Sequence, residues 1–199
     1  MEVILPLLIF VLVSTITPGP NNFLLATSGI KFGFQATWRH VFGIHCGIYL
    51  LVLLCGLGLG QILAGLPEAM WALKLFGTGY LIYLAWKILG FDMSKVDIES
   101  NGRPMGFIEA AIFQFSNPKA WMMVTTGLNI GLGNEGTTML SAGLYLCMGF
   151  ATVGLCCNLT WLSAGASLRQ LWLQERYQKR INGFLAVLTL LAIATFWWM

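Results

Sequence analysis

Charged side chains are scarce in this chain of 199 residues: 10% are Asp, Glu, Lys or Arg, whereas 57% are hydrophobic. The mean hydropathy is +0.76, a balance that excludes an ordinary soluble domain. The sequence contains no Walker P-loop and no G-x-S-x-G nucleophile elbow. We therefore expect neither an enzyme nor an ATP-driven pump, and we expect no cofactor.

Metal-binding patterns are also absent. The five cysteines lie in apolar segments without C-x-x-C spacing, and the two histidines, His40 and His45, form no H-E-x-x-H motif. The cysteines are interpreted as packing residues, and no metal site is expected. Only Cys156 and Cys157 are adjacent, which leaves thiolate chemistry open as a minor alternative.

Six apolar stretches are long enough to cross a membrane, because a spanning helix needs about 20 residues. They fall near residues 3–30, 40–64, 70–90, 106–130, 138–166 and 181–199. The sequence therefore predicts an all-α integral membrane protein with six transmembrane helices. The first stretch follows Glu2 and not a basic segment, and it lacks an A-x-A cleavage site, so we expect it to be retained and not removed as a signal peptide.

Lysine and arginine side chains gather in alternate connections between these spans. The first, third and fifth connections hold Lys31, Arg39, Lys87, Lys95, Arg103, Arg169, Arg176, Lys179 and Arg180. Because positively charged loops stay in the cytoplasm, we expect these connections inside the cell and both termini outside it. Residues 167–180 mix apolar and basic side chains, which predicts a short helix on the membrane surface or a polar loop.

The chain divides into two halves of a single transmembrane domain, residues 1–199. Three spans (1–90) precede a polar cytoplasmic linker (91–104), and three spans (105–199) follow it. An odd number of spans per half predicts two inverted three-helix repeats. The first span of each half is interrupted, at residues 17–22 and 116–119, and such paired breaks are a sequence pointer to the binding site of a secondary transporter.

Both breaks have the residues that restart a helix. Gly19 and Asn117 suit the capping position, and the proline after each suits the first helical position. Each restart would aim free backbone N–H groups and a positive dipole at an anion, and Lys119 would add a full charge. The alternative is that Pro18 and Pro20 only kink a helix while Lys119 reaches an interface.

Other polar residues within the spans complete the candidate site. Glu109 and His45 can carry protons, although an interfacial acid and a packing histidine are the plainer interpretations. The glycine pair Gly43 and Gly47 allows close helix packing, within one chain or in a homodimer. The candidate substrate-binding residues are Pro18, Gly19, Pro20, Asn21, Asn22, Gln114, Asn117, Pro118, Lys119 and Asn158, and the proton-coupling candidates are Glu109 and His45.

Three motifs follow one another in an order that is specific for one protein family. They are T-P-G-P-N-N at residues 17–22, G-I-H-C-G at 43–47 and G-F-I-E-A-A-I-F-Q-F-S-N-P-K-A at 106–120. With them the chain resembles the lysine-exporter (LysE) superfamily, and within it the RhtB-type amino-acid exporters. The asparagine pair and the residues after it look most like the cysteine and O-acetylserine branch. The likeness covers nearly the whole chain.

The resemblance implies a multi-pass bacterial inner-membrane protein that exports small neutral amino acids or derivatives: threonine, homoserine, cysteine or O-acetylserine. It also implies proton coupling, and alternating access around a midplane site. The partners are then an amino acid and membrane lipid, with no nucleic acid and with a homodimer allowed. The alternative is a metal-ion or other cation exporter or channel of the same superfamily. The adjacent Cys156 and Cys157 support this alternative.

The residues agree with a neutral substrate. A lysine or arginine side chain would need buried carboxylates, and apart from Glu109 the spans contain none. Lys119 can bind the carboxylate of the substrate. The side chains of Asn21, Asn22 and Asn117 can accept hydrogen bonds from the ammonium group of the substrate.

Overall fold

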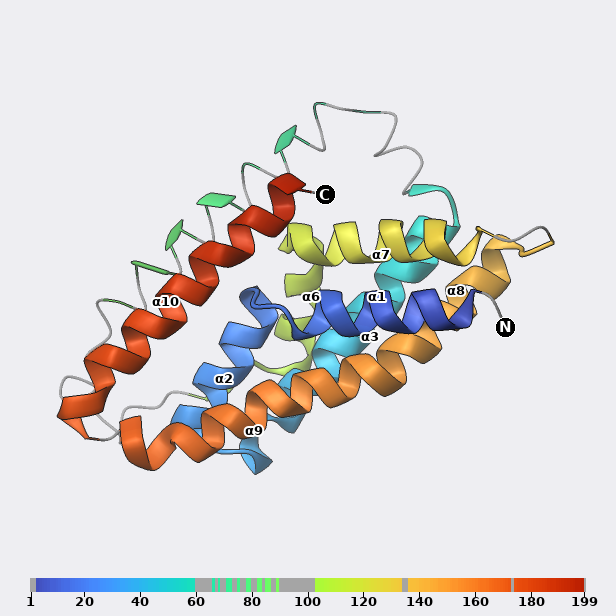
Figure 1. The fold of residues 1–199 in the computed structure, drawn as a ribbon. Helices are drawn as coiled ribbons and strands as arrows, with labels where there is room; N and C mark the ends of the chain where they lie inside the picture. The colour runs from blue at the N-terminus through green and yellow to red at the C-terminus, as the bar shows by residue number, and fades with distance from the viewer. Residues whose placement is uncertain are drawn as a thin grey trace.

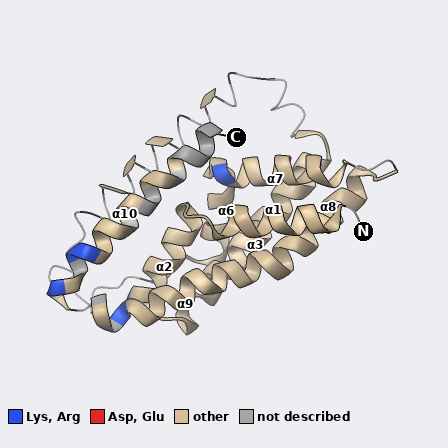
Figure 2. Cartoon of the chain, in the orientation of Figure 1, with Lys and Arg blue, Asp and Glu red and all other residues tan. Residues whose placement is uncertain are grey.

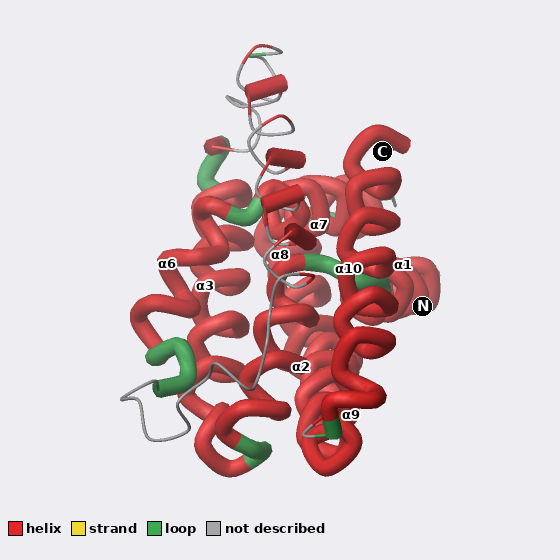
Figure 3. The backbone as a smooth tube through the Cα atoms, turned by 90° about the vertical axis from the view of Figure 1, so that its left-hand side faces the viewer, coloured by secondary structure: helices red, strands yellow, loops and turns green. Residues whose placement is uncertain are grey.

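The structure is a computed structural model that describes residues 3–59, 103–133, 136–172 and 174–198, together with scattered positions between 66 and 89. Within these residues the secondary structure is helical and contains no strand, as Figure 3 shows. The all-α prediction is confirmed for this part of the chain. Much of the predicted third span (70–90) and most of the polar linker lie outside the described residues.

The first break bends one apolar segment into two helices, α1 (Ile4–Ile16) and α2 (Pro20–Phe32), at 55° to each other. Gly19 precedes α2 in an extended conformation and Pro20 is the first helical residue, as the sequence predicts. Proline loses nothing there, because the N–H that it lacks would have no partner within the helix. α2 ends at Gly33, whose φ of 82° favours glycine.

The second break separates α6 (Phe107–Ser116) from α7 (Pro118–Gly131). The side-chain oxygen of Asn117 accepts a hydrogen bond of 3.2 Å from the backbone N–H of Lys119, and Pro118 is the first residue of α7. This satisfies one of the free N–H groups at the helix start. The predicted cap at Asn117 is confirmed.

Two longer helical runs frame the breaks. A 3-10 turn (Gln35–Thr37) leads into α3 (Trp38–Gly56), and α8 (Met139–Gly149) continues through a π-helical turn, η3 (Phe150–Gly154), into α9 (Leu155–Trp172). Both runs are long and apolar enough to cross a membrane, and the bent α1–α2 pair is a third span of this kind among the described residues. The last helix, α10, covers Glu175–Trp198.

The prediction of a surface helix or polar loop over residues 167–180 is wrong. α9 continues to Trp172 and α10 begins at Glu175, with a tight turn in which Gln174 N–H donates to Leu171 O over 3.1 Å. Leu168 and Ile181 line the same crevice between α9 and α10. Leu168 therefore faces a neighbouring helix, whereas Leu171 is 45% exposed, and the segment belongs to two longer helices and is not a separate surface helix.

Glycines allow two pairs of helices to touch backbone to backbone. A Cβ on Gly165 of α9 would lie 2.1 Å from the carbonyl oxygen of Ala26 in α2. In the same way, a Cβ on Gly43 or Gly47 of α3 would lie 2.3 or 2.5 Å from a carbonyl oxygen of α6. The pair Gly43 and Gly47 therefore packs within one chain, which decides the alternative left open by its sequence spacing.

These contacts also show the direction of the helices. Gly29 and Gly33 of α2 lie beside Leu162 and Arg169 of α9, so the two helices run in the same direction and their basic ends lie together. Figure 2 shows further Lys and Arg segments where α9 meets α10. In Figure 1, α1 lies between α7 and the α8–α9 run, and it is in contact with both.

Candidate functional site

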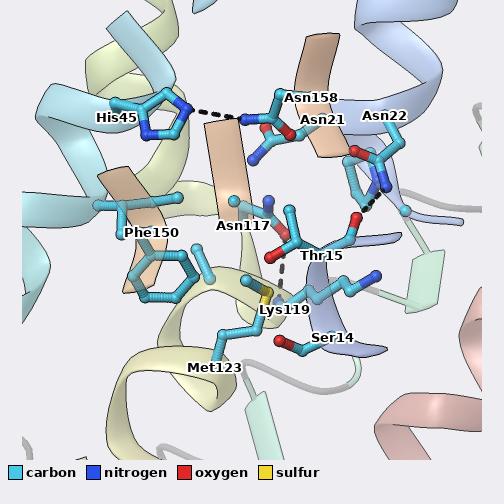
Figure 4. Close-up of a pocket in the computed structure, with 15 residues that line it drawn as sticks. Ser14, Thr15, Asn21, Asn22, His45, Asn117, Lys119, Met123, Phe150 and Asn158 are labelled. Atoms are coloured by element: carbon cyan, nitrogen blue, oxygen red, sulfur yellow. Dashed lines mark hydrogen bonds between the residues drawn. The ribbon is translucent and has the colours of Figure 1, made fainter. Parts of the chain in front are cut away.

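A small cavity lies where the two helix breaks meet, and Figure 4 shows its lining. The lining residues are Ser14, Thr15, Gly19, Pro20, Asn21, Asn22, His45, Ile48, Asn117, Lys119, Ala120, Met123, Phe150, Gly154 and Asn158. They come from α1, α2, α3, α7, η3 and α9, so both halves of the chain contribute. The volume is about 20 Å³, which is room for one water molecule and not for an amino acid.

Lys119 is buried at the centre of this site, with 8% of its surface exposed. Its Nζ donates to the carbonyl oxygen of Thr17 at 2.8 Å, to Thr17 Oγ1 at 2.9 Å and to the carbonyl oxygen of Pro18 at 3.1 Å. An ammonium has three N–H groups, and all three are used here. The lysine therefore does not reach an interface; it joins the second break to the first.

The position of Lys119 suits a cation for a second reason. Thr17 follows the last residue of α1, where a helix has unpaired carbonyl groups and a partial negative charge. Nearby, α2 and α7 begin at Pro20 and Pro118, with partial positive charge and free N–H groups. The site thus offers a cation and two helix starts to a carboxylate, in surroundings whose other side chains are uncharged.

The amides around the cavity hold the breaks in place. Asn22 Nδ2 donates to the carbonyl oxygens of Thr15 at 2.6 Å and Thr17 at 2.8 Å, which satisfies carbonyl groups at the end of α1. Asn21 and Gln114 exchange two hydrogen bonds, of 2.8 and 3.1 Å, between the first break and α6. Gln114 is fully buried and lies beside the cavity without lining it.

His45 and Asn158 form a second polar pair, between α3 and α9. Asn158 Nδ2 lies 3.2 Å from His45 Nε2, and both residues are buried. With Nδ2 of the Asn158 amide assigned to face the ring, the NH₂ group donates, Nε2 accepts and the ring proton is on Nδ1. Neither His45 Nδ1 nor Thr15 Oγ1 has a hydrogen-bond partner, although both atoms are buried.

Glu109 lies away from the cavity, near the start of α6. Its carboxylate accepts from Gly106 N at 2.7 Å and from Arg103 Nη1 at 2.9 Å, and its side chain is 49% exposed. The hydrogen bond from Arg103 and the charge of the carboxylate raise the pKa of the Arg103 guanidinium above its ordinary value. These contacts favour the interpretation of Glu109 as an acid at the membrane interface and not as a proton carrier at the site.

Of the remaining predicted residues, Pro18 contributes its carbonyl oxygen to Lys119, and Pro118 is buried at the start of α7. Sequence reasoning missed several lining residues: Ser14, Thr15, Ile48, Ala120, Met123, Phe150 and Gly154. Thr15 had a weak signal, since it precedes the first break by two residues. Phe150 and Gly154 had none, because they enter the site through the π-helical turn η3.

The adjacent cysteines have different surroundings: Cys156 is exposed and Cys157 is buried. Within the described part of the chain, no three His, Cys, Asp or Glu side chains gather where they would hold a metal ion. Among the described residues, the candidate binding site is therefore the one around Lys119, where polar residues of both halves are in contact.

Comparison with known proteins relates the chain to a family of translocators. The family described as "LysE type translocator" matches residues 12–197. The chain is 30% identical over 180 residues to proteins named "Cysteine/O-acetylserine efflux protein" from Escherichia coli (strain K12), Shigella flexneri serotype 5b and Shigella sonnei, covering 90% of this chain and 89% of each relative. No solved structure matches the chain significantly.

Proposed function

The chain belongs to the LysE type translocator family, and from this premise we propose that it exports small neutral amino acids or their derivatives across a bacterial inner membrane. Membership makes it a membrane transport protein related to amino-acid exporters. The finer proposal is a secondary transporter for solutes of the cysteine, O-acetylserine, threonine and homoserine class. The relatives named above favour the first two of these.

One observation carries this proposal: both helix breaks line one cavity, with the buried Lys119 as its cation. A zwitterionic amino acid needs a partner for its carboxylate, which Lys119 and the starts of α2 and α7 supply. Its ammonium needs acceptors, which the Thr17 and Pro18 carbonyls supply. A basic substrate would add a second cation, for which this cavity has no carboxylate among its lining residues.

The volume of the cavity supports alternating access. At about 20 Å³ it must widen to admit an amino acid. The contacts between Lys119 and Thr17 and between Asn21 and Gln114 join the two halves across it. We expect the solute carboxylate to replace the first-break oxygens at Lys119, so that solute binding itself releases one contact between the halves.

His45 is the proposed proton-coupling residue. It lines the cavity, whereas Glu109 is exposed and paired with Arg103. In the arrangement described, His45 Nε2 accepts from Asn158, so protonation of that nitrogen would break a contact between α3 and α9. Protonation would thus act on the packing of two helices that line the site.

The proposed topology has six spans, in two inverted halves with both termini outside. The bent α1–α2 segment and the broken α6–α7 segment support it, because they open the two halves in corresponding ways. The common direction of α2 and α9, which brings Lys31 and Arg169 to one end, supports a single cytoplasmic face.

Transport by purified protein tests the proposal. Proteoliposomes are loaded with labelled cysteine, O-acetylserine, threonine, homoserine or lysine, and efflux is followed with and without a pH gradient. We expect efflux of neutral solutes, accelerated by the gradient, and none of lysine. Efflux of lysine alone, or of cadmium or zinc ions with no amino acid, would contradict the proposal.

A further inference from the structure

Two polar atoms of the cavity have no hydrogen-bond partner: Thr15 Oγ1 and His45 Nδ1. Thr15 is 7% exposed and His45 is 5% exposed, so neither side chain is well solvated. Both residues line the cavity. A buried polar group without a partner costs about 1–3 kcal/mol, so atoms of this kind are retained where something else binds them.

The backbone of Thr15 and the imidazole ring of His45 are each held by a neighbour. The backbone carbonyl of Thr15 accepts from Asn22 Nδ2 at 2.6 Å, and the other nitrogen of the His45 ring faces Asn158 Nδ2 at 3.2 Å. The hydroxyl and the Nδ1–H group are thus presented from α1 and α3 on positions that are already fixed. In the view of Figure 4, Thr15 lies between the His45–Asn158 pair and Lys119.

The chemistry of the two atoms limits what they can bind. His45 Nδ1 carries the proton and only donates, while the Thr15 hydroxyl donates or accepts. An ammonium group has no lone pair and cannot bond to a donor. A carboxylate carries a full charge and has Lys119 as its partner in the proposed function. The remaining group of a small amino acid is an oxygen or sulfur atom in its side chain.

We propose that Thr15 and His45 form a side-chain subsite that selects amino acids with a hydroxyl, ester or thiol group close to Cβ. This rests on the proposed function and narrows its substrate class to solutes such as serine, cysteine and their derivatives. Apolar side chains of the same length, such as that of 2-aminobutyrate, leave both atoms without a partner. The lining residues Met123 and Phe150 contact the carbon atoms of either solute equally well.

The test compares two solutes of equal size in proteoliposomes: L-serine, with a side-chain hydroxyl, and L-2-aminobutyrate, with a methyl group in its place. The readout is the ratio of their kcat/KM values. A change that only weakens the fold lowers both values and leaves their ratio unchanged. Thr15→Val removes the hydroxyl and keeps the shape of the side chain, so we expect the ratio to fall about five- to tenfold.

Two matched variants accompany it. Thr15→Ser keeps the hydroxyl and should keep the wild-type ratio. Ser14→Ala removes a neighbouring hydroxyl that also lines the cavity but already donates to the Val11 carbonyl at 3.2 Å, and it should keep the ratio as well. If Thr15→Val is poorly folded, binding to the wild-type protein decides instead: serine should raise its unfolding temperature more than 2-aminobutyrate does.

The outcomes separate this inference from the proposed function. Export of both solutes by the wild type with equal kcat/KM, or an unchanged ratio in Thr15→Val, overturns the subsite and leaves the exporter intact. A wild-type protein that transports no amino acid overturns the proposed function and the subsite with it.

Discussion

Lys119 Nζ lies 2.8 Å from the carbonyl oxygen of Thr17, although the two residues are 102 positions apart in the chain. Each belongs to one of the two helix breaks, so a single ammonium connects the two halves. The same ammonium is the proposed partner of the substrate carboxylate. Substrate binding and the contact between the halves therefore compete for one side chain, which is the basis of the predictions that follow.

Replacement of this lysine should abolish the carboxylate contact. Lys119→Met keeps a side chain of similar length without the charge. Hydrogen bonds to charged groups contribute about 1.5–3 kcal/mol, so we expect kcat/KM for a neutral amino acid to fall about 10- to 100-fold in proteoliposomes. Arg39→Met, which removes an exposed cation outside the cavity, serves as the control. Equal transport by Lys119→Met and the control would rule out the proposed role.

Gly19 gives the lysine its space. A Cβ at this position would lie 2.9 Å from Lys119 Cδ and 3.0 Å from Nζ, while the extended backbone of Gly19 suits any residue. Since the end of a lysine side chain can move, Gly19→Ala should fold and displace the ammonium. We expect a KM about fivefold higher, the equivalent of one weakened hydrogen bond. In the control Gly56→Ala the nearest atom would be 3.7 Å away, and its KM should not change.

The crossing of α2 and α9 should tolerate no side chain at Gly165. Its Cβ would lie 2.1 Å from the Ala26 carbonyl oxygen, a backbone atom that cannot move alone. Overpacking of this kind costs about 1–3 kcal/mol, so Gly165→Ala should lower the unfolding temperature of the detergent-solubilised protein. Gly183→Ala provides the contrast. In α10 no described atom lies within 4 Å of the added Cβ, and helix propensity predicts a gain of about 0.5–1 kcal/mol.

Proton coupling should depend on His45 and not on Glu109. A pH gradient across the proteoliposome membrane should accelerate efflux. We expect Glu109→Gln to keep this acceleration, because the Glu109 carboxylate is exposed and paired with Arg103. His45→Gln should lose the acceleration while keeping exchange of labelled for unlabelled 2-aminobutyrate, a solute that makes no hydrogen bond to His45 and whose exchange needs no net proton movement. The opposite pattern would return the coupling role to Glu109.

Asn117 should matter for stability more than for solute choice. Its side chain caps α7, and the loss of such a cap costs about 1 kcal/mol. Asn117→Ala should therefore unfold at a lower temperature than the wild type, whereas Asn117→Ser, which keeps a capping oxygen, should be close to it. A drop of equal size in both variants would mean that the amide acts through another contact.

Both helix breaks could be predicted from sequence because their causes are local. Pro20 and Pro118 lack the N–H that a helix interior needs, and Gly19 and Asn117 suit the position before a first turn. The composition likewise placed the chain in a membrane, and the motifs at residues 17–22 and 106–120 indicated its family. The continuous α9 beyond residue 167 was missed because the mixture of basic and apolar residues there also fits a surface helix.

Sequence alone thus determined the membrane class, the family and the two places where the helices are interrupted, since each depends on composition or on neighbouring residues. Only the tertiary structure decided what those interruptions contact. It paired Lys119 with Thr17, Asn21 with Gln114 and His45 with Asn158, and it left Thr15 without a partner. These relations join residues far apart in the chain, and they depend on how helices cross at their glycines, which no spacing within one segment specifies.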